Sequence, residues 1–223
     1  MPRIADPREL DSKRFGRLPS PRQPRSREAL DRFIESGEQL LEDHAFEAAS
    51  VAEIAARAAS SVGSFYRLVG TKDELLRAIH DRFLDESEDL IEAALSVERL
   101  AAADAPAILR AFVALLVDVF ARREGLLRAL IVRSSAEPEF RASVQALNTR
   151  LEDRLVLLLA PHVAQIGHPR PHQAIRFGVA VVLGALNQNT FAHTAASRNS
   201  PSLVRELTRV LATYLSLDPN RST

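Results

Sequence analysis

Apolar residues recur at intervals of three and four along most of the chain, a spacing that places them on one face of a helix. Proline or glycine marks several of the breaks between these stretches, where helices begin or end. No alternating pattern of useful length indicates a strand. We therefore expect an all-α fold of about nine helices, at residues 26–43, 50–58, 61–68, 72–95, 106–122, 124–135, 138–165, 171–193 and 201–217.

Two helix starts in the first third of the chain are marked by a hydroxyl and a carboxylate three residues apart. Ser50 precedes Glu53, and Thr71 precedes Glu74. In such a capping box the hydroxyl accepts a free backbone N–H of the first turn and the carboxylate reaches back to the cap. Between the two boxes, small residues at 59–61 separate two short apolar faces. This order predicts a helix-turn-helix.

The second helix of this motif, at residues 61–68, has a composition suited to contact with DNA. It contains no acidic residue. Small hydroxyls, a bare backbone and one positive charge allow the N-terminal end of a helix to enter a major groove. The residues that offer these groups are Ser61, Gly63, Ser64, Tyr66 and Arg67.

The run IAARAASSVGSFYRLVGTKDEL resembles the DNA-binding signature of the TetR (tetracycline repressor) family of transcriptional regulators. The resemblance implies that Ser61, Gly63 and Ser64 face DNA. It further implies that Tyr66 holds a phosphate and that Lys72 contacts a phosphate from the start of the following helix.

The sequence departs from the family pattern at four positions. Ala45 and Ala59 stand where the family usually has glycine, Ser60 replaces an apolar residue, and Val69 replaces an aromatic one. Glycine is favoured where φ is positive, so we expect the turns at the two alanines to be built slightly differently. None of the four changes removes a DNA-contacting group.

Composition sets the outer bounds of the prediction. The 223 residues, 46% hydrophobic and 26% charged, suffice for one large or two modest domains. The absence of cysteine excludes a disulfide scaffold and a thiolate metal site, and it fits a reducing cytoplasm. The longest apolar run, Phe177–Leu186, is far shorter than the roughly 20 residues that span a bilayer. With no apolar signal segment after Met1, we expect a cytoplasmic protein.

The formal net charge is zero, so attraction to DNA must come from the distribution of charge. Residues 1–27 carry eight basic and three acidic side chains, whereas residues 28–80 carry five basic and ten acidic ones. Residues 1–25 form a basic, proline-rich arm, which we expect to be extended or disordered. The arm is either a solvated tail or a minor-groove arm. In the second case its candidate DNA contacts are Arg22, Arg25 and Arg27.

Residues 26–71 are expected to form the DNA-binding domain and residues 72–223 a helical domain for effector binding and dimerisation. The last two helices contain small residues and apolar stripes, which suit either an internal core pair or a contact with a partner. The resemblance implies a homodimer interface, and a two-fold dimer suits a palindromic site. The residues assigned to this interface are Val182, Gly184, Ala185, Leu207, Leu211 and Tyr214.

The preceding helices are rich in Ala, Leu and Val, and these residues form either a core or the wall of an effector pocket. Ligand pockets are mostly apolar with a few placed polar groups. The pocket candidates are Phe112, Leu116, Phe120, Leu127, Ile131, Asn148, Leu151 and Asn187.

The sequence thus predicts a repressor that a small, largely apolar effector releases from a palindromic operator in double-stranded DNA. One alternative is an architectural DNA-binding dimer without an effector. A helical-bundle enzyme is a weaker alternative, because no histidine follows a Glu at the spacing of a di-iron site and no GxSxG, P-loop or GxGxxG motif occurs. No catalytic residue, metal site, cofactor or membrane partner is expected.

Overall fold

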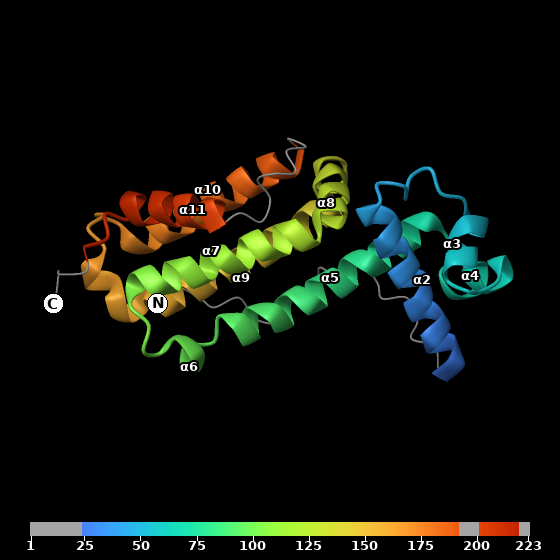
Figure 1. Ribbon diagram of the computed structural model, residues 1–223, viewed down its shortest axis with the longest axis horizontal. Coiled ribbons are helices and arrows are strands. Elements are labelled where there is room, and N and C mark those ends of the chain that lie inside the picture. Colours follow the sequence, from blue (N-terminus) through green and yellow to red (C-terminus); the bar gives the residue numbers. More distant parts are fainter. Residues whose placement is uncertain (1–23, 192–200, 219–223) are drawn as a thin grey trace. The chain divides into compact units, whose positions relative to one another are not determined.

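The computed structural model describes residues 24–191 and 201–218 (Figure 1). Within these ranges no β-strand forms, and one isolated antiparallel bridge joins Ile166 to Leu217. The predicted all-α class is confirmed, with the short α6 and η1 as additions. The helices are α2 Pro24–Glu42, α3 Val51–Arg57, α4 Val62–Leu68, α5 Lys72–Ala94, α6 Val97–Leu100, α7 Ala105–Arg122, α8 Glu124–Ala136, α9 Pro138–Leu159, the 3₁₀-helix η1 Ala160–Gln165, α10 Pro171–Phe191 and α11 Pro201–Tyr214.

Two helices differ from their predicted bounds because of proline. The helix expected at 138–165 ends as an α-helix at Leu159 and continues as η1, since Pro161 has no N–H for an α-helical hydrogen bond. At the other end of the chain, α2 already begins at Pro24, a residue suited to the first helical position. Arg25 and Arg27 therefore lie on a helix and not on an extended arm. Arg22 and the rest of the arm up to residue 23 lie outside the described residues.

The first of two compact units comprises residues 24–87 and 125–143 of the described chain. Its core contains Phe33, Ile54 and Phe65, all fully buried. The rings of Phe33 and Phe65 meet edge to face, with centroids 5.4 Å apart and planes at 86°. Gly37 allows α2 to approach α5, because a Cβ there would lie 2.6 Å from Ile79 Cδ1. The unit therefore includes the helix-turn-helix, the first part of α5, and α8 with the start of α9.

The N-terminus of α8 is capped by a carboxylate from α2. Glu42 accepts hydrogen bonds from the backbone N–H groups of Gly125, at 2.8 Å, and Leu126, at 3.4 Å. Two of the donors that a helix start leaves unpaired are satisfied in this way. The backbones meet closely, since a Cβ on Gly125 would lie 2.1 Å from the carbonyl oxygen of Leu41. Gly125 is thus required by close approach.

A network of ion pairs fastens α8 and the start of α9 to α5. The Arg133 guanidinium pairs with Asp73 and Glu137, each at 2.6 Å. Arg77 pairs with Glu137 at 3.2 Å and with Glu139 at 3.1 Å. The hydrogen bond to Glu137 is the main cause that raises the pKa of Arg133, with Asp73 adding to it. A network of this kind holds helices in place better than an isolated surface pair does.

His80 is buried in the same contact. Its Nε2 lies 3.2 Å from the Ser143 hydroxyl, and its ring packs on Phe140 with centroids 5.0 Å apart. Burial is the main cause that lowers the pKa of His80 to about 4, and the nearby Arg77 charge contributes to the same shift. His80 is therefore neutral at physiological pH and serves as part of the packing.

The second unit comprises residues 88–124, 144–191 and 201–218 of the described chain. In it α7, α10 and α11 pack against one another (Figure 1). Its core includes Phe112 and Leu155, both fully buried. Gly178 lets α10 approach α11, because a Cβ there would lie 2.3 Å from Leu211 Cδ1. The contact between these two helices is therefore internal along this side.

Two features are absent from the parts of the chain that the structure describes. No helix there is long and apolar enough to cross a membrane. No group of three or more His, Cys, Asp and Glu side chains is arranged to hold a metal ion there.

We predict that Gly125→Ala lowers the free energy of unfolding by about 1 to 3 kcal/mol, because the added Cβ forces the α2 and α8 backbones apart. Urea denaturation followed by circular dichroism measures the change. Gly63→Ala is the control, since a Cβ there meets only Ser61 Oγ at 3.9 Å. It should leave stability unchanged or raise it by up to about 1 kcal/mol. Equal effects of the two substitutions would contradict the close contact at Gly125.

Candidate functional site

Both predicted capping boxes are formed and set the starts of α3 and α5. The Ser50 N–H donates to Glu53 at 2.7 Å, and the Glu53 N–H donates to the Ser50 hydroxyl at 3.2 Å. Thr71 and Glu74 exchange the same two bonds, at 2.7 and 3.1 Å. The hydrogen bond from the Ser50 backbone is the main cause that lowers the pKa of Glu53. The helix starts predicted from the sequence are confirmed.

The turn between α3 and α4 is a Schellman ending built on an alanine. The Ser60 N–H bonds the Ala55 carbonyl at 2.9 Å, and the Ala59 N–H bonds the Ala56 carbonyl at 3.1 Å. Ala59 has φ of +46°, the left-handed conformation that glycine adopts most easily. Ser61 then caps α4 by accepting from the Ser64 N–H at 3.1 Å. The turn keeps the geometry of a glycine turn and carries the strain of a Cβ.

The turn after α2 uses a different residue from the one expected. The positive φ falls on His44, at +56°, and not on Ala45. The Ala45 N–H bonds the Leu40 carbonyl at 2.8 Å and the His44 N–H bonds the Leu41 carbonyl at 3.0 Å. The residue with the left-handed backbone is therefore His44, one position before Ala45, where the family pattern has glycine.

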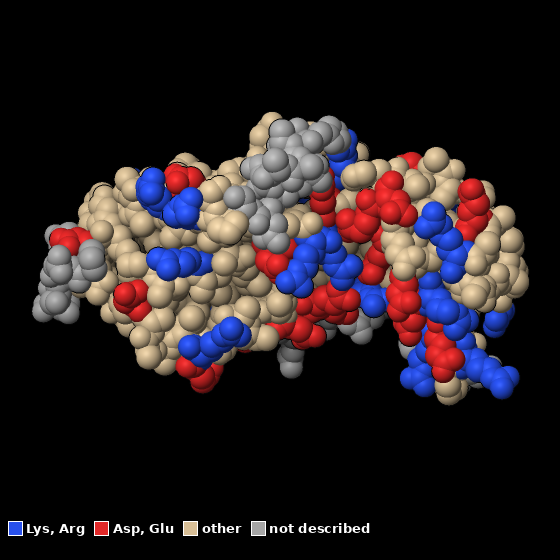
Figure 2. Space-filling model, viewed as in Figure 1, with Lys and Arg blue, Asp and Glu red and all other residues tan. Residues whose placement is uncertain are grey.

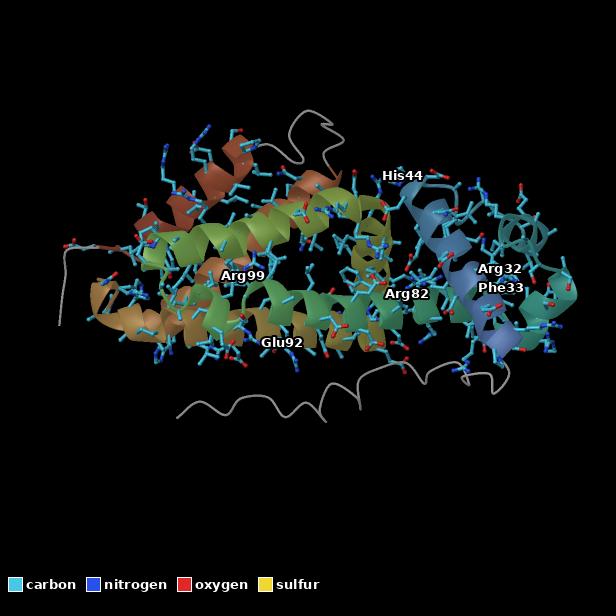
Figure 3. The ribbon with its side chains drawn as sticks, turned by 60° about the horizontal axis from the view of Figure 1, so that its bottom comes forward. Arg32, Phe33, His44, Arg82, Glu92 and Arg99 are labelled. Carbon is cyan, nitrogen blue, oxygen red and sulfur yellow. The ribbon has the colours of Figure 1, made fainter. Side chains whose placement is uncertain are left out.

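Two side chains of α2 hold the end of α3, and sequence reasoning missed both. The Arg32 Nε–H donates to the Ala58 carbonyl at 3.0 Å, and the Ser36 hydroxyl donates to the Ile54 carbonyl at 3.2 Å. Figure 3 labels Arg32 and its neighbour Phe33 on α2. Ser36 lies within the apolar stripe of α2 and is itself buried. A buried hydroxyl needs a hydrogen-bond partner. A serine within the apolar stripe of a helix is therefore the sequence feature that indicates a contact of this kind.

Helix α4 is anchored by one buried ring and exposes its other side. Phe65 is fully buried, whereas Tyr66 is 60% exposed and meets the Phe65 ring edge to face at 5.8 Å. Gly63 and Arg67 are exposed as well. The acid-free surface of α4 is thus exposed to solvent, while the buried Phe65 ring anchors the helix to the core.

The predicted DNA contacts at the start of α4 share one surface. Ser61 is exposed and donates its hydroxyl to Ser64 Oγ at 3.0 Å, and Ser64 is half-buried. Ser61, Gly63, Tyr66 and Arg67 all remain accessible. The arrangement can place a short helix with small side chains in a major groove.

Residues 33–79 match the family of bacterial regulatory proteins described as the tetR family. The helix-turn-helix domain belongs to the TetR family. Proteins of this family are DNA-binding regulators and not enzymes. A comparison with curated proteins gives no significant match.

Solved structures extend the likeness in fold over most of the chain. A structure described as a TetR-family transcriptional regulator of Mesorhizobium loti MAFF303099 is 17% identical, with a TM-score of 0.67, covering 87% of this chain and 98% of its own. PfmR, a TetR-family regulator of Thermus thermophilus, is 24% identical, with a TM-score of 0.60 and coverage of 82% and 97%. GusR of Salmonella enterica is 14% identical, with a TM-score of 0.63 and coverage of 88% and 99%. The second domain therefore shares the TetR-type fold.

Lys72 has a structural role in the TetR-type domain that the sequence did not reveal. Its ammonium donates to the backbone carbonyls of Glu47 and Ala49, each at 2.9 Å, and lies 5.2 Å from the centroid of the Phe46 ring. These contacts tie the start of α5 to the connection between α2 and α3. An ammonium has three N–H donors, so one remains for the predicted phosphate contact.

Basic side chains gather at the N-terminal end of α2 (Figure 2). Arg25 and Arg27 lie there, and both are exposed. The first turn of α2 contains no acidic residue. This end of the TetR-type domain offers positive charge that a DNA backbone would attract.

The predicted effector residues occupy several environments. Phe112, Leu116 and Leu151 are buried in the core of the second unit. Phe120 is partly buried and borders a cavity of about 10 Å³, the room of a single water molecule. The remaining four candidates are on α8, where Leu127 is buried and Ile131 half-buried, and on α9 and α10, where Asn148 and Asn187 are half-buried.

Three of the predicted dimer residues are buried within the chain. Val182, Leu207 and Leu211 are 0%, 8% and 1% exposed, so they already pack within the chain and have little surface left for a partner. Of the other three, Ala185 is half-buried and packs against the core, whereas Gly184 and Tyr214 are exposed. Both helices carry two adjacent apolar stripes, and the sequence alone did not tell which one faces inward.

The exposed stripes of α10 and α11 form a separate apolar surface, which we call the α10–α11 face. Phe177 and Tyr214 connect the two helices across it, with ring centroids 5.4 Å apart. A Cβ on Gly184 would meet nothing within 4 Å, so the face is open at that point. The face consists of Phe177, Ala180, Val181 and Gly184 on α10 and Val210 and Tyr214 on α11.

We predict that Ala59→Gly raises the free energy of unfolding by about 0.5 to 1 kcal/mol. The left-handed conformation costs an L-residue roughly 1 to 2 kcal/mol, and part of that gain is lost to the greater freedom of glycine in the unfolded chain. Ala56→Gly, at an exposed helical position three residues earlier, should lower stability by about 1 kcal/mol instead. Urea titrations of both variants measure these opposite signs, and a loss of stability in Ala59→Gly would show that the turn is unstrained.

Proposed function

We propose that the chain is a transcriptional repressor that binds a palindromic operator as a homodimer and leaves it when a small, largely apolar effector binds. The observation that carries this proposal is the exposed, acid-free surface of α4 on a capped helix-turn-helix of the TetR family. The fold of the second domain supports the same class of regulator.

In this proposal α4 enters the major groove. Gly63 and Ser64 lie where base edges would meet the helix, because neither has a large side chain to hold the backbone away. Tyr66 projects from the exposed side of α4 and would donate its hydroxyl to a phosphate. Lys72, at the start of α5, would use its remaining N–H on the DNA backbone. Contacts to phosphate position the protein, and contacts to bases select the sequence.

The α10–α11 face supports the proposed homodimer. A helix pair with exposed Phe177, Val181, Val210 and Tyr214 has a continuous apolar surface that water solvates poorly. Gly184 in the same face allows a second helix to approach closely. A two-fold contact through this face would present two copies of α4 to the two halves of a palindrome.

The attachment of α8 supports the proposed response to an effector. Within the first unit, α8 is fixed to α2 through Glu42 and Gly125 and to α5 through Arg133 and Asp73. A ligand that favours a different position of α8 would therefore displace the elements that carry α3 and α4. The ligand must bind the two positions with unequal affinity, since equal affinity shifts no population.

The DNA-binding proposal is tested by selecting double-stranded fragments from a random library with the purified protein. We expect an inverted repeat to be enriched. Binding of the selected fragment by fluorescence anisotropy should weaken about equally on all sequences for Tyr66→Ala, because a phosphate contact is lost. Ser64→Ala should instead change the ranking of operator variants. Enrichment of no sequence, or of one without two-fold symmetry, would refute the palindromic operator.

The dimer proposal predicts that Gly184→Leu shifts the protein from dimer to monomer. Overpacking a close helix contact costs about 1 to 3 kcal/mol, and a two-fold interface contains the position twice. Sedimentation equilibrium measures the shift, and operator affinity should fall with it. Thr149→Leu, an exposed position on α9, is the control and should leave the dimer intact. A dimer of unchanged strength in Gly184→Leu would remove Gly184 from the interface.

The effector proposal is tested by thermal-shift measurements with small apolar compounds. A compound that raises the melting temperature and also releases the selected DNA fragment would be an effector. An architectural dimer would show neither effect.

A further inference from the structure

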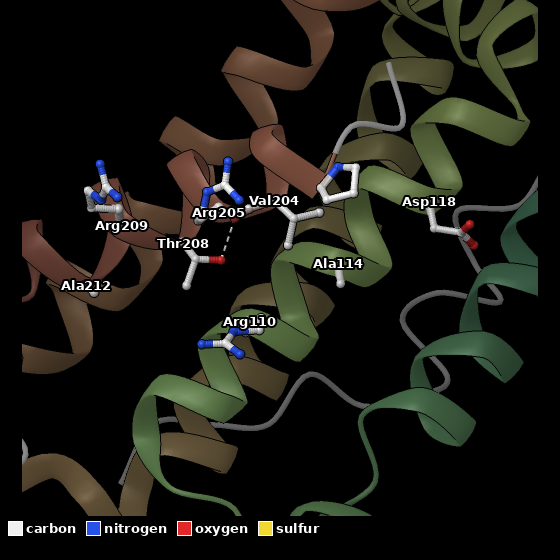
Figure 4. A pocket seen from close by; sticks show the side chains of 9 residues that line it. Arg110, Ala114, Asp118, Val204, Arg205, Thr208, Arg209 and Ala212 are labelled. Carbon is white, nitrogen blue, oxygen red and sulfur yellow. Dashed lines mark hydrogen bonds between the residues drawn. The ribbon is translucent and has the colours of Figure 1, made fainter. Parts of the chain in front are cut away.

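A groove of about 790 Å³ lies between α7 and α11 in the second unit (Figure 4). Its floor is made by Ala114 of α7 and by Val204 and Ala212 of α11, all half-buried. The Thr208 hydroxyl donates to the Val204 carbonyl at 2.7 Å, so its hydrogen is already bonded within the helix. The floor is therefore mainly apolar, and the volume is that of a site for a small organic ligand.

Arginine side chains stand along the edges of this groove. Arg110 reaches it from α7, and Arg205 and Arg209 reach it from α11 (Figure 4). Arg209 has an acidic partner in Glu206, at 3.4 Å. Within the described residues, neither the Arg110 nor the Arg205 side chain has a hydrogen bond or ion pair. The groove therefore has two guanidinium groups available on opposite sides.

Some other arginines of the second unit are paired with acidic side chains, whereas Arg110 and Arg205 are not in the part of the chain that the structure describes. Arg176 pairs with Glu152 and Asp153, and Arg154 pairs with Glu92. The acidic residue that does line the groove, Asp118, is already paired with Arg122 at 2.8 Å. The groove thus has a local excess of positive charge although the chain as a whole has none.

The two free guanidinium groups fit one kind of headgroup. A guanidinium donates two parallel hydrogen bonds to an anion with several oxygens, such as a phosphate or a carboxylate. The floor beside them is formed mainly by apolar side chains, which suit a hydrocarbon better than a sugar or a peptide. A hydrocarbon chain would bury apolar surface there and gain about 0.8 kcal/mol per CH₂ group.

We propose that the groove between α7 and α11 binds an anionic amphiphile, in which an oxyanion headgroup is joined to a hydrocarbon chain. Arg110 and Arg205 bind the headgroup, and the chain lies along Ala114, Val204 and Ala212. None of the eight residues that the sequence analysis assigned to an effector lines this groove. The site is a separate one and does not depend on the proposed role in DNA binding.

The position of the groove on α11 leaves the α10–α11 face free. Val204, Thr208 and Ala212 follow one another at intervals of four on one flank of the helix, whereas Val210 and Tyr214 follow the other flank. The buried residues Leu207 and Leu211 lie between the two flanks. A ligand in the groove would therefore touch α11 without covering the surface proposed for the dimer.

The proposal is tested by isothermal titration calorimetry of the full chain with decyl phosphate and decanoate, each below its micelle concentration. We expect both to bind, decanol to bind at least ten times more weakly, and inorganic phosphate to show no measurable binding. Equal affinity for decanol would remove the role of the arginines. Equal affinity for inorganic phosphate would remove the role of the apolar floor, and no binding of either amphiphile would overturn the proposal.

Variants separate the two halves of the site. Arg110→Gln with Arg205→Gln should weaken decyl phosphate at least tenfold, and Arg170→Gln, an exposed arginine outside the groove, should change nothing. Ala114→Phe keeps both arginines but fills the floor, and it should also abolish binding. Circular dichroism and the melting temperature show whether each variant is folded. If the double arginine variant is unfolded, the single Arg205→Gln variant replaces it in the titration.

Full affinity in a folded arginine variant would overturn the assignment of the headgroup. Full affinity in Ala114→Phe would overturn the assignment of the chain. Because these titrations contain no DNA, their failure leaves the repressor proposal untouched, and the failure of DNA selection leaves the groove untouched.

Discussion

The edge-to-face contact of Phe33 and Phe65 is the interaction on which the DNA-binding surface depends. Helices α3 and α4 have seven residues each, and helices of that length are unstable alone in water. Their position comes from α2, which supplies Phe33 to the core and binds the last carbonyls of α3 through Arg32 and Ser36. Because Phe65 lies next to Tyr66 in the chain, the ring that is buried also sets the direction of the residue that is exposed.

The features that the sequence predicted well are those whose partners are close in the chain. Both capping boxes join residues three apart, so their hydrogen bonds follow from spacing alone. The turn at Ala59 could be located for the same reason, although its strain was read from the structure. In these places local chemistry and the final fold agree.

The features that the sequence did not predict depend on residues far apart in the chain. Lys72 bonds carbonyls more than twenty positions away, and Glu42 caps a helix that begins more than eighty positions later. In the last two helices the difficulty was different, because two neighbouring apolar stripes have similar side chains. Only packing decides that Val182 and Leu211 face inward while Val181 and Tyr214 face outward. Where two stripes compete, a sequence pattern identifies the helix but not its rotation.

The unit that contains the helix-turn-helix is discontinuous, since residues 125–143 complete it after an intervening stretch that belongs to the other unit. His80 is covered by Phe140 and Ser143, and the backbone of α8 packs closely on the end of α2 at Gly125. During synthesis the DNA-binding surface therefore emerges from the ribosome well before the segment that finishes its own core. Until α8 and the start of α9 have been made, the core of this unit is incomplete in the nascent chain. A fragment that ends after α5 would likewise leave uncovered the side of α2 and α5 on which α8 and the start of α9 pack.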